Sequence, residues 1–217
     1  ALAAIDAVVD RLGPKAPRLW RDTDQAYWAV RSAFSGALAA EKLRWPGAWF
    51  TRKGAHFFVA TVFAGSPAAA AGLKVGDEIE SVDGAPLQPV ASFKKLRPKT
   101  RLAVKIKRLA YGKPATVRLG TEVKSVQETL LTGIRQGTRV FDFKTKKIAY
   151  VPLWATSTRE ARDEIQTILA RDARETDGAI IDLRGHFGGA DLSMAELFFD
   201  LPVDPAEKDP AKIKMTP

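Results

Sequence analysis

The sequence predicts an α+β protein with N-terminal helices, a β-rich middle and a βαβ unit towards the C-terminal end. Three observations support this: apolar residues at helical spacing before residue 44, short alternating segments between 49 and 120, and a strand–helix–strand order from 147 onwards. The 217 residues are 46% hydrophobic and 27% charged, which suits a packed core and excludes wholesale disorder. The absence of cysteine excludes disulfides, cysteine-ligated zinc and a thiol nucleophile.

Two helices are expected in a first segment, residues 1–44. Apolar residues recur at helical spacing over 1–12, and Gly13-Pro14 ends that pattern. A second helix is predicted from about Asp22 to Lys42, where Asp22 and Gln25 have the form of a capping box. Its apolar face comprises Tyr27, Val30, Phe34 and Leu38.

The middle segment, residues 45–124, is predicted to be mainly strands. Residues 49–63 are interpreted as two strands that turn near Lys53-Gly54, and Ser66-Pro67 begins a short helix that Gly72 ends. The remaining elements expected here are a strand at Glu78–Val82, a short helix at 90–96, and a hairpin formed by 101–108 and 114–120.

The last segment, residues 125–217, has the order of a βαβ unit. A strand at Lys147–Pro152, a helix at Thr158–Arg174 and a buried strand at Gly178–Leu183 lead into a glycine turn and a further helix from about Asp191. Such a unit implies a parallel strand pair with a right-handed crossover.

The positive charge of the chain is concentrated in one stretch. The net charge is +9, and residues 91–150 carry 16 basic side chains against 3 acidic ones. We interpret this stretch as a solvated strand face, since no motif typical of nucleic-acid recognition accompanies it, and no nucleic-acid partner is expected. Two histidines are too few for a histidine-rich metal site, so no metal is expected either.

A twenty-residue motif within the middle segment resembles the PDZ domains of bacterial proteases. Residues 65–84 read GSPAAAAGLKVGDEIESVDG, and the family pattern is GSPAxxAGLxxGDxIxxVDG. The resemblance implies a module that binds an extended polypeptide end at a sheet edge, with its carboxylate held by backbone N–H groups of a loop. The segment at the position of that loop is Gly47, Ala48, Trp49 and Phe50.

Trp49 departs from the family's loop, which has a second glycine at this position. Two interpretations stay open. Trp49 distorts or covers the carboxylate pocket, because a glycine there often takes a backbone shape that tryptophan tolerates poorly. Alternatively, Trp49 and Phe50 are core aromatics at the start of a strand.

The last segment is similar to the core of the C-terminal processing (tail-specific) serine protease family. Its strand and turn, Gly178–Gly189, read GAIIDLRGHFGG, where the family has DLRxNxGG. The resemblance implies that a backbone N–H of Gly188 or Gly189 stabilises the oxyanion. Asp182 and Arg184 are expected to brace the turn, by a buried ion pair or by backbone hydrogen bonds. His186, which replaces the family's Asn, is not expected to be a general base.

The family's nucleophile and base are not recognisable in this chain. The resemblance places the catalytic Ser and its Lys beyond Pro217, and Ser66, Ser81 and Ser193 have no recognisable base beside them. We therefore expect the 217 residues by themselves to lack peptidase activity.

Two functions follow as hypotheses. The first is a serine endopeptidase whose PDZ domain recruits or gates polypeptides by their C-terminal ends, without a metal or organic cofactor, in the periplasm or associated with the cell envelope. The alternative is a non-catalytic peptide-binding scaffold on a degenerate protease fold. The sequence carries no signal for an oligomeric state.

Overall fold

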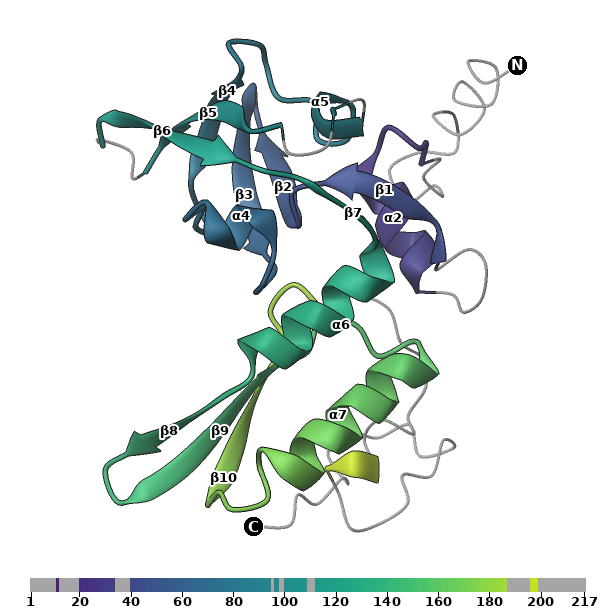
Figure 1. Ribbon diagram of the computed structural model, residues 1–217, viewed down its shortest axis with the longest axis vertical. Helices are drawn as coiled ribbons and strands as arrows, with labels where there is room; N and C mark the ends of the chain where they lie inside the picture. Colours follow the sequence, from purple (N-terminus) through teal and green to yellow (C-terminus); the bar gives the residue numbers. More distant parts are fainter. Residues whose placement is uncertain are drawn as a thin grey trace.

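The computed structural model describes residues 11, 20–33, 40–94, 96–97, 100–108, 112–186 and 196–198. Most of the helix expected at 1–12 and of the one expected after Asp191 lies outside these residues. The described chain forms two parts, each built around a sheet, and helix α6 runs from one part to the other (Figure 1). The mixture of helices and sheets confirms the α+β fold class.

The first part is a five-stranded antiparallel sheet in the order β2-β3-β4-β5-β6. β2 and β6 are its two edge strands. The strands predicted between residues 49 and 120 are confirmed, with the bounds β2 Ala48–Lys53, β3 His56–Val62, β4 Glu78–Val82, β5 Leu102–Lys107 and β6 Pro114–Leu119.

Two short helices, α4 (Pro67–Ala70) and α5 (Ala91–Lys94), pack against this sheet. The Ser66 hydroxyl caps α4 by accepting a hydrogen bond from the Ala69 N–H at 3.2 Å, as the sequence predicts. The core between sheet and helices includes Ala68 from α4 and Phe93 from α5, both fully buried.

A two-stranded ribbon, which was not predicted, pairs the segment before the five-stranded sheet with the segment that follows it. β1 (Lys42–Trp45) pairs antiparallel with β7 (Glu122–Ser125). The helix predicted from about Asp22 to Lys42 is therefore wrong at its end. α2 covers Gln25–Ser32, and Lys42 belongs to β1 because its backbone pairs with Ser125.

Helix α6 (Val126–Gly137) follows β7 and was also not predicted. A capping box fixes its start, since the Ser125 hydroxyl accepts from the Glu128 N–H at 3.0 Å and the Glu128 carboxylate accepts from the Ser125 N–H at 2.9 Å. Val126 and Leu130 of α6 share a buried cluster with Trp28, Leu43 and Trp45, so α2 and β1 pack against the first turns of α6.

The second part is a three-stranded sheet in the order β10-β9-β8. β9 (Lys146–Pro152) and β10 (Gly178–Asp182) run parallel, joined by helix α7 (Arg159–Arg171), which confirms the predicted parallel pair. β8 (Arg139–Phe143) pairs antiparallel with β9 and was not predicted.

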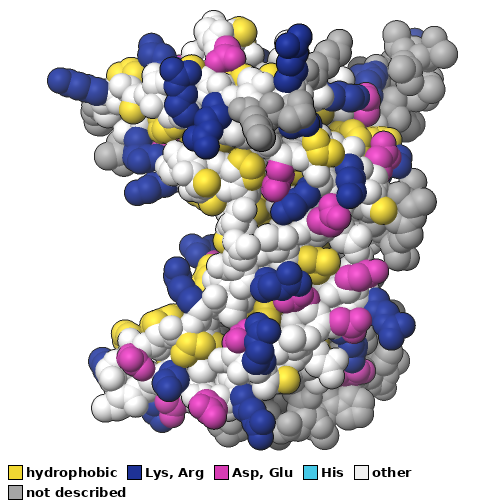
Figure 2. Space-filling view, in the orientation of Figure 1, with side chains coloured by type: hydrophobic (Ala, Val, Ile, Leu, Met, Phe, Trp, Pro, Cys, Tyr) yellow, Lys and Arg dark blue, Asp and Glu magenta, His cyan; other side chains and the backbone are white. Residues whose placement is uncertain are grey.

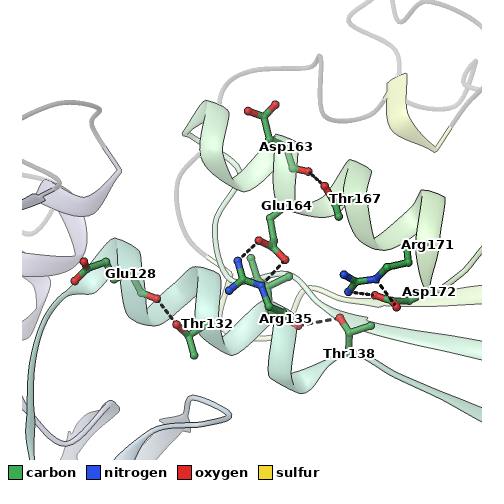
Figure 3. Close-up of polar contacts among 10 residues, drawn as sticks. Glu128, Thr132, Arg135, Thr138, Asp163, Glu164, Thr167, Arg171 and Asp172 are labelled. Atoms are coloured by element: carbon green, nitrogen blue, oxygen red, sulfur yellow. Dashed lines mark hydrogen bonds and ion pairs between the residues drawn. The ribbon is translucent and has the colours of Figure 1, made fainter.

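Helices α6 and α7 lie beside each other in the second part. The Arg135 guanidinium of α6 forms an ion pair with the Glu164 carboxylate of α7 (Figure 3). Beneath this pair, Ile134, Val151, Ile165 and Ile168 form a buried core shared by both helices and β9.

The strand predicted at Gly178–Leu183 is confirmed as β10, but the prediction that it is buried is wrong. Ile180 is 50% exposed and Leu183 is 57% exposed, although Ile181 packs against the core. β10 is an edge strand of the described sheet, so one of its faces and its outer edge meet no described element. Within the described ranges, no helix is both long and apolar enough to cross a membrane.

Candidate functional site

The loop before β2 is locked onto the start of α4. Gly47 has φ +72°, and a Cβ atom built on it would lie 2.3 Å from the Cβ of Ser66. The Gly47 carbonyl accepts a hydrogen bond from the Phe63 N–H at 3.1 Å, and the Pro46 carbonyl accepts from the Ala68 N–H at 2.9 Å. Glycine is thus required at position 47 by backbone shape and by space.

Ala48 and Phe50 direct backbone groups to the edge of β2 that faces away from β3. The Ala48 carbonyl accepts a hydrogen bond from the side-chain amide of Gln25 at 3.1 Å, and the Phe50 N–H donates to the Gln25 side-chain oxygen at 2.9 Å. Gln25 is the first residue of α2, which lies beside this end of the sheet (Figure 1).

Helix α5 contacts β2 through an aromatic pair. The Phe50 ring stacks on the Phe93 ring, with centroids 6.2 Å apart and an interplanar angle of 17°. The Lys94 ammonium lies 2.6 Å from the Asp22 carboxylate, just before α2, and this hydrogen bond lowers the pKa of Asp22. The segment Asp22–Gln25, which ends at the first residue of α2, therefore contacts both β2 and α5.

Trp49, the residue that departs from the expected loop, packs into the core. Its ring centroid lies 4.8 Å from that of Trp45 and 5.9 Å from that of Phe63. Its φ is not positive, so tryptophan strains no backbone here. Of the four residues predicted to bind a peptide, Gly47, Ala48 and Phe50 border the β2 edge, and Trp49 supports it from the aromatic cluster.

A second polar cluster lies at the end of β10. The Asp182 carboxylate accepts hydrogen bonds from the Arg184 N–H at 3.0 Å, from the Arg184 guanidinium at 2.7 and 2.9 Å, and from the Tyr150 hydroxyl at 2.5 Å. The expectation that Asp182 and Arg184 brace the turn is confirmed. The pair is only half buried, however, because the Asp182 side chain is 9% exposed and the Arg184 side chain 88%.

The electrostatics of this cluster hold Asp182 ionised. The hydrogen bonds from Arg184 and then from Tyr150 lower the pKa of Asp182 far below its usual range. Burial, followed by the hydrogen bond to Asp182, raises the pKa of Tyr150 above its ordinary value of 10.0. Asp182 is therefore ionised and Tyr150 neutral at pH 7, as their hydrogen bond requires.

A cavity of about 510 Å³ opens between the two parts, and Figure 2 shows the hollow on that side of the molecule. Residues of β3 line one side and the β10 turn lines the other. The lining includes Thr61, Val62, Tyr150, Trp154, Asp182 and Arg184. The cavity is thus bounded by both parts.

His186 follows this turn and lies 3.2 Å from the Thr156 hydroxyl through its Nε2 atom. Burial lowers its pKa, so the imidazole is neutral at pH 7. Gly188 and Gly189, the predicted oxyanion residues, lie outside the described residues, and their role stays a prediction. Among the residues described, no group of three or more His, Cys, Asp or Glu is arranged to hold a metal ion.

Two contributors to these sites were missed by sequence reasoning. Gln25 meets β2 through a contact between residues more than twenty positions apart, for which no local pattern exists. Tyr150 stands opposite Ile180 in the β9–β10 register, and the alternation of β9 together with the predicted parallel pair could have placed it near Asp182.

The sequence model of the PDZ domain matches residues 58–108. The chain therefore contains a PDZ domain, and the matched residues include α4, β4, α5 and β5 and most of β3. No curated protein sequence matches the chain.

Several solved structures are similar to the chain. The photosystem II D1 C-terminal processing protease is 16% identical, with 78% of this chain and 46% of that chain covered and a TM-score of 0.49. A putative S41 protease from Bacteroides fragilis is 20% identical, with 85% of this chain and 52% of that chain covered and a TM-score of 0.42. An HtrA-type protease, AlgW, with a decapeptide is 19% identical, with 38% of this chain and 30% of that chain covered and a TM-score of 0.35. The chain spans about half or less of the length of these proteases.

Proposed function

We propose that the chain binds the C-terminal ends of polypeptides along the free edge of β2. The observation that carries this proposal is an edge strand of the PDZ domain whose outward backbone groups, the Ala48 carbonyl and the Phe50 N–H, bond a side chain and not another strand. An extended peptide added at this edge would bond the same groups with its main chain, and the loop at Gly47 would receive its carboxylate.

We propose further that the second part is the beginning of a C-terminal processing serine endopeptidase core. The DLRGHFGG turn supports this, as does the braced Asp182–Arg184 pair, which holds the chain rigidly just before Gly188 and Gly189. In the complete protein, a backbone N–H of this turn would stabilise the oxyanion, and the PDZ domain would recruit or gate the substrate. The family resemblance implies an exported protein, in the periplasm or at the cell envelope.

A peptide-binding assay tests the first proposal. Fluorescein-labelled decapeptides ending in Ala, Val, Leu or Phe are titrated with the chain, each with a free carboxylate and as its C-terminal amide. We expect at least one free-acid peptide to bind about tenfold or more tightly than its amide, because a charge-assisted hydrogen bond is lost. Equal binding of every acid and amide pair would contradict carboxylate recognition.

Catalysis is tested in the complete protein. Alanine keeps the backbone N–H, but its Cβ disfavours the backbone shape that we expect of a glycine in this turn. If the N–H is thereby turned away from the oxyanion, Gly188→Ala or Gly189→Ala is expected to lower turnover about 100- to 1000-fold, the cost of losing one donor. The melting temperature of each variant is measured beside its turnover. Unchanged turnover in both variants would reduce the two glycines to turn formers.

A non-catalytic scaffold remains the second candidate. In the part of the chain that the structure describes, no serine hydroxyl bonds a lysine or histidine side chain, and those of Ser66 and Ser125 serve as helix caps. Incubating the purified 217-residue chain with unfolded casein is therefore expected to give no cleavage. A complete protein that binds free-acid peptides but shows no turnover would establish the scaffold.

A further inference from the structure

The side chain of Gln25 has the hydrogen-bonding capacity of a peptide group. Its amide offers N–H donors and one carbonyl acceptor, and in this structure it uses one of each on the same strand edge. The Ala48 carbonyl receives the donor and the Phe50 N–H meets the acceptor. These are the backbone groups that an added strand needs, so Gln25 and a peptide cannot hold them at the same time.

The residues just before Gln25 also contact helix α5. Asp22, three residues before Gln25, places its carboxylate 2.6 Å from the ammonium of Lys94 on α5. The segment therefore contacts β2 through Gln25 and α5 through Asp22. It places both an amide and a carboxylate beside the edge proposed to receive a peptide's main chain and C-terminal carboxylate.

The position of this segment is fixed by packing. Trp28 of α2 is 6% exposed, and its indole N–H donates to the Asp22 carbonyl at 2.9 Å. Trp28 belongs to the buried cluster that contains Leu43 and Trp45 of β1, which directly precedes β2. α2 is thus anchored to the PDZ domain independently of its two polar contacts.

We propose that the segment Asp22–Gln25 is an internal ligand of the PDZ domain, which a polypeptide end must displace from β2 before it binds. This inference rests on the proposed function of the β2 edge. Displacement requires the Gln25 side chain to leave the Ala48 carbonyl and the Phe50 N–H, which it holds by one hydrogen bond each. The internal ligand would lower the affinity of every peptide by the same factor, so that only peptides with high intrinsic affinity bind at a given concentration.

Peptide affinity of a Gln25→Ala chain tests this inference. The free-acid decapeptides ending in Ala, Val, Leu or Phe serve as probes, measured by fluorescence anisotropy. Because two neutral hydrogen bonds no longer compete, we expect binding about tenfold tighter than to the natural chain. Alanine is a good helix former, so α2 is expected to persist.

Two further variants control the measurement. Gln127→Ala removes a glutamine side chain that bonds Glu160 in the second part, and it should leave affinity unchanged. Asp22→Asn removes the charge facing Lys94 and should raise affinity by a smaller, salt-dependent factor.

The outcomes distinguish peptide binding at the β2 edge from competition by Gln25 for that edge. Equal affinity of the natural and Gln25→Ala chains would overturn the internal ligand and leave peptide binding standing. Weaker binding by Gln25→Ala would likewise overturn it, since Gln25 would then assist the peptide. Absence of binding by both chains would overturn the proposed function and the inference with it.

Discussion

Gly47 illustrates how one residue fixes the edge on which the proposed function depends. Both its φ of +72° and the 2.3 Å approach of Ser66 exclude a side chain, whereas Gly54, at the β2–β3 turn, has φ +61° with open space around it. The two glycines therefore separate the cost of backbone strain from the cost of a clash.

The Gly47→Ala variant is expected to lose about 2–5 kcal/mol of unfolding free energy, because strain and overpacking add. Gly54→Ala should lose about 1–2 kcal/mol, because it suffers strain alone. Urea denaturation of both variants measures the difference. Equal losses would show that Ser66 and α4 move aside at little cost.

Asp77 is the most buried carboxylate among the described ion pairs, at 1% side-chain exposure. Burial alone would raise its pKa, but the Arg108 guanidinium, which bonds both oxygens at 2.7 Å, and the Lys74 N–H together lower it. A lowered folded-state pKa stabilises the fold above the unfolded pKa of about 3.9, and this stabilisation is lost as the pH falls through the folded value.

Arg108→Ala is expected to destabilise the chain by about 2–3 kcal/mol at pH 7, since it leaves a buried carboxylate without its cation. The difference from the natural chain should shrink as the pH falls, because Asp77 becomes protonated first in the variant, where burial raises its pKa, and at lower pH in the natural chain. Lys105→Ala, which removes the exposed ion pair with Glu80, is the matched control and should cost far less. A difference that stays constant from pH 7 to pH 3 would contradict this account.

At the scale of elements, the parallel β9–β10 pair positions the turn that precedes Gly188. Tyr150 of β9 ties the two strands at this end through its hydrogen bond to Asp182. Because burial and Asp182 raise the pKa of Tyr150, its phenol should ionise above pH 10.

Ultraviolet titration of the natural chain and of Tyr150→Phe measures this ionisation directly. The difference between the two curves is expected to appear above pH 10, with Tyr150→Phe also less stable at pH 7 by about 1–2 kcal/mol. A Tyr150 that titrates at or below pH 10 would mean that the contact with Asp182 is absent in solution.

Helix α6 connects the two sheets, and its start depends on the capping box. Ser125→Ala should destabilise the chain by about 1 kcal/mol, because the Glu128 N–H loses its acceptor. Ser125→Thr, which keeps an acceptor oxygen, is the control and should restore most of that stability. Equal stability of all three chains would show that β7, and not the cap, sets the start of α6.

Elements with a local signature could be predicted from the sequence, and those that depend on distant partners could not. Ser66-Pro67 and Gly72 predicted α4, and alternation predicted β2 to β6. β1 could not be predicted, because its partner β7 lies about eighty residues away in the sequence. Ser125 and Glu128 form a local signal for the start of α6. The apolar composition of β10 does not show its exposure, which depends on its place at the sheet edge.

The candidate sites divide in the same way. The loop Gly47–Phe50 and the Asp182–Arg184 brace were identified because their residues are close in sequence and belong to recognisable motifs. Gln25 was not, because its role arises only when α2 packs against β1 and β2 through Trp28. Which strand edge a side chain meets is decided by tertiary packing.

Over the whole molecule, part of the positive charge of residues 91–150 is paired with acidic side chains from other segments. Basic residues of the 91–150 stretch pair with acidic residues from outside it in both parts, and Figure 2 shows both signs interspersed on the face drawn. These pairs are Lys94–Asp22, Lys105–Glu80, Arg108–Asp77, Arg135–Glu164 and Lys146–Asp177. Most of these pairs lie at the surface, and only the Arg108–Asp77 pair includes a fully buried carboxylate.

The proposed peptide-binding edge and the cavity lie close to each other in the molecule. The β2 edge lies on the PDZ domain, and the cavity lined by Thr61 and Asp182 lies between the PDZ sheet and the β10 turn. Thr61 belongs to β3, the strand that pairs with β2. A single strand, β3, thus lies between the β2 edge and the cavity.

The central claim is that a polypeptide end adds to the edge of β2, and the five-stranded sheet contains its own control in the other edge strand, β6. The measurement is a backbone ¹⁵N–¹H correlation spectrum of the chain, recorded during titration with a free-acid decapeptide. We predict the largest shifts at the amides of Ala48–Lys53 and Ala91–Lys94, with those of β6 unchanged. Shifts centred on β6 or on the sheet of β8 to β10, or no shifts at saturating peptide, would contradict the account.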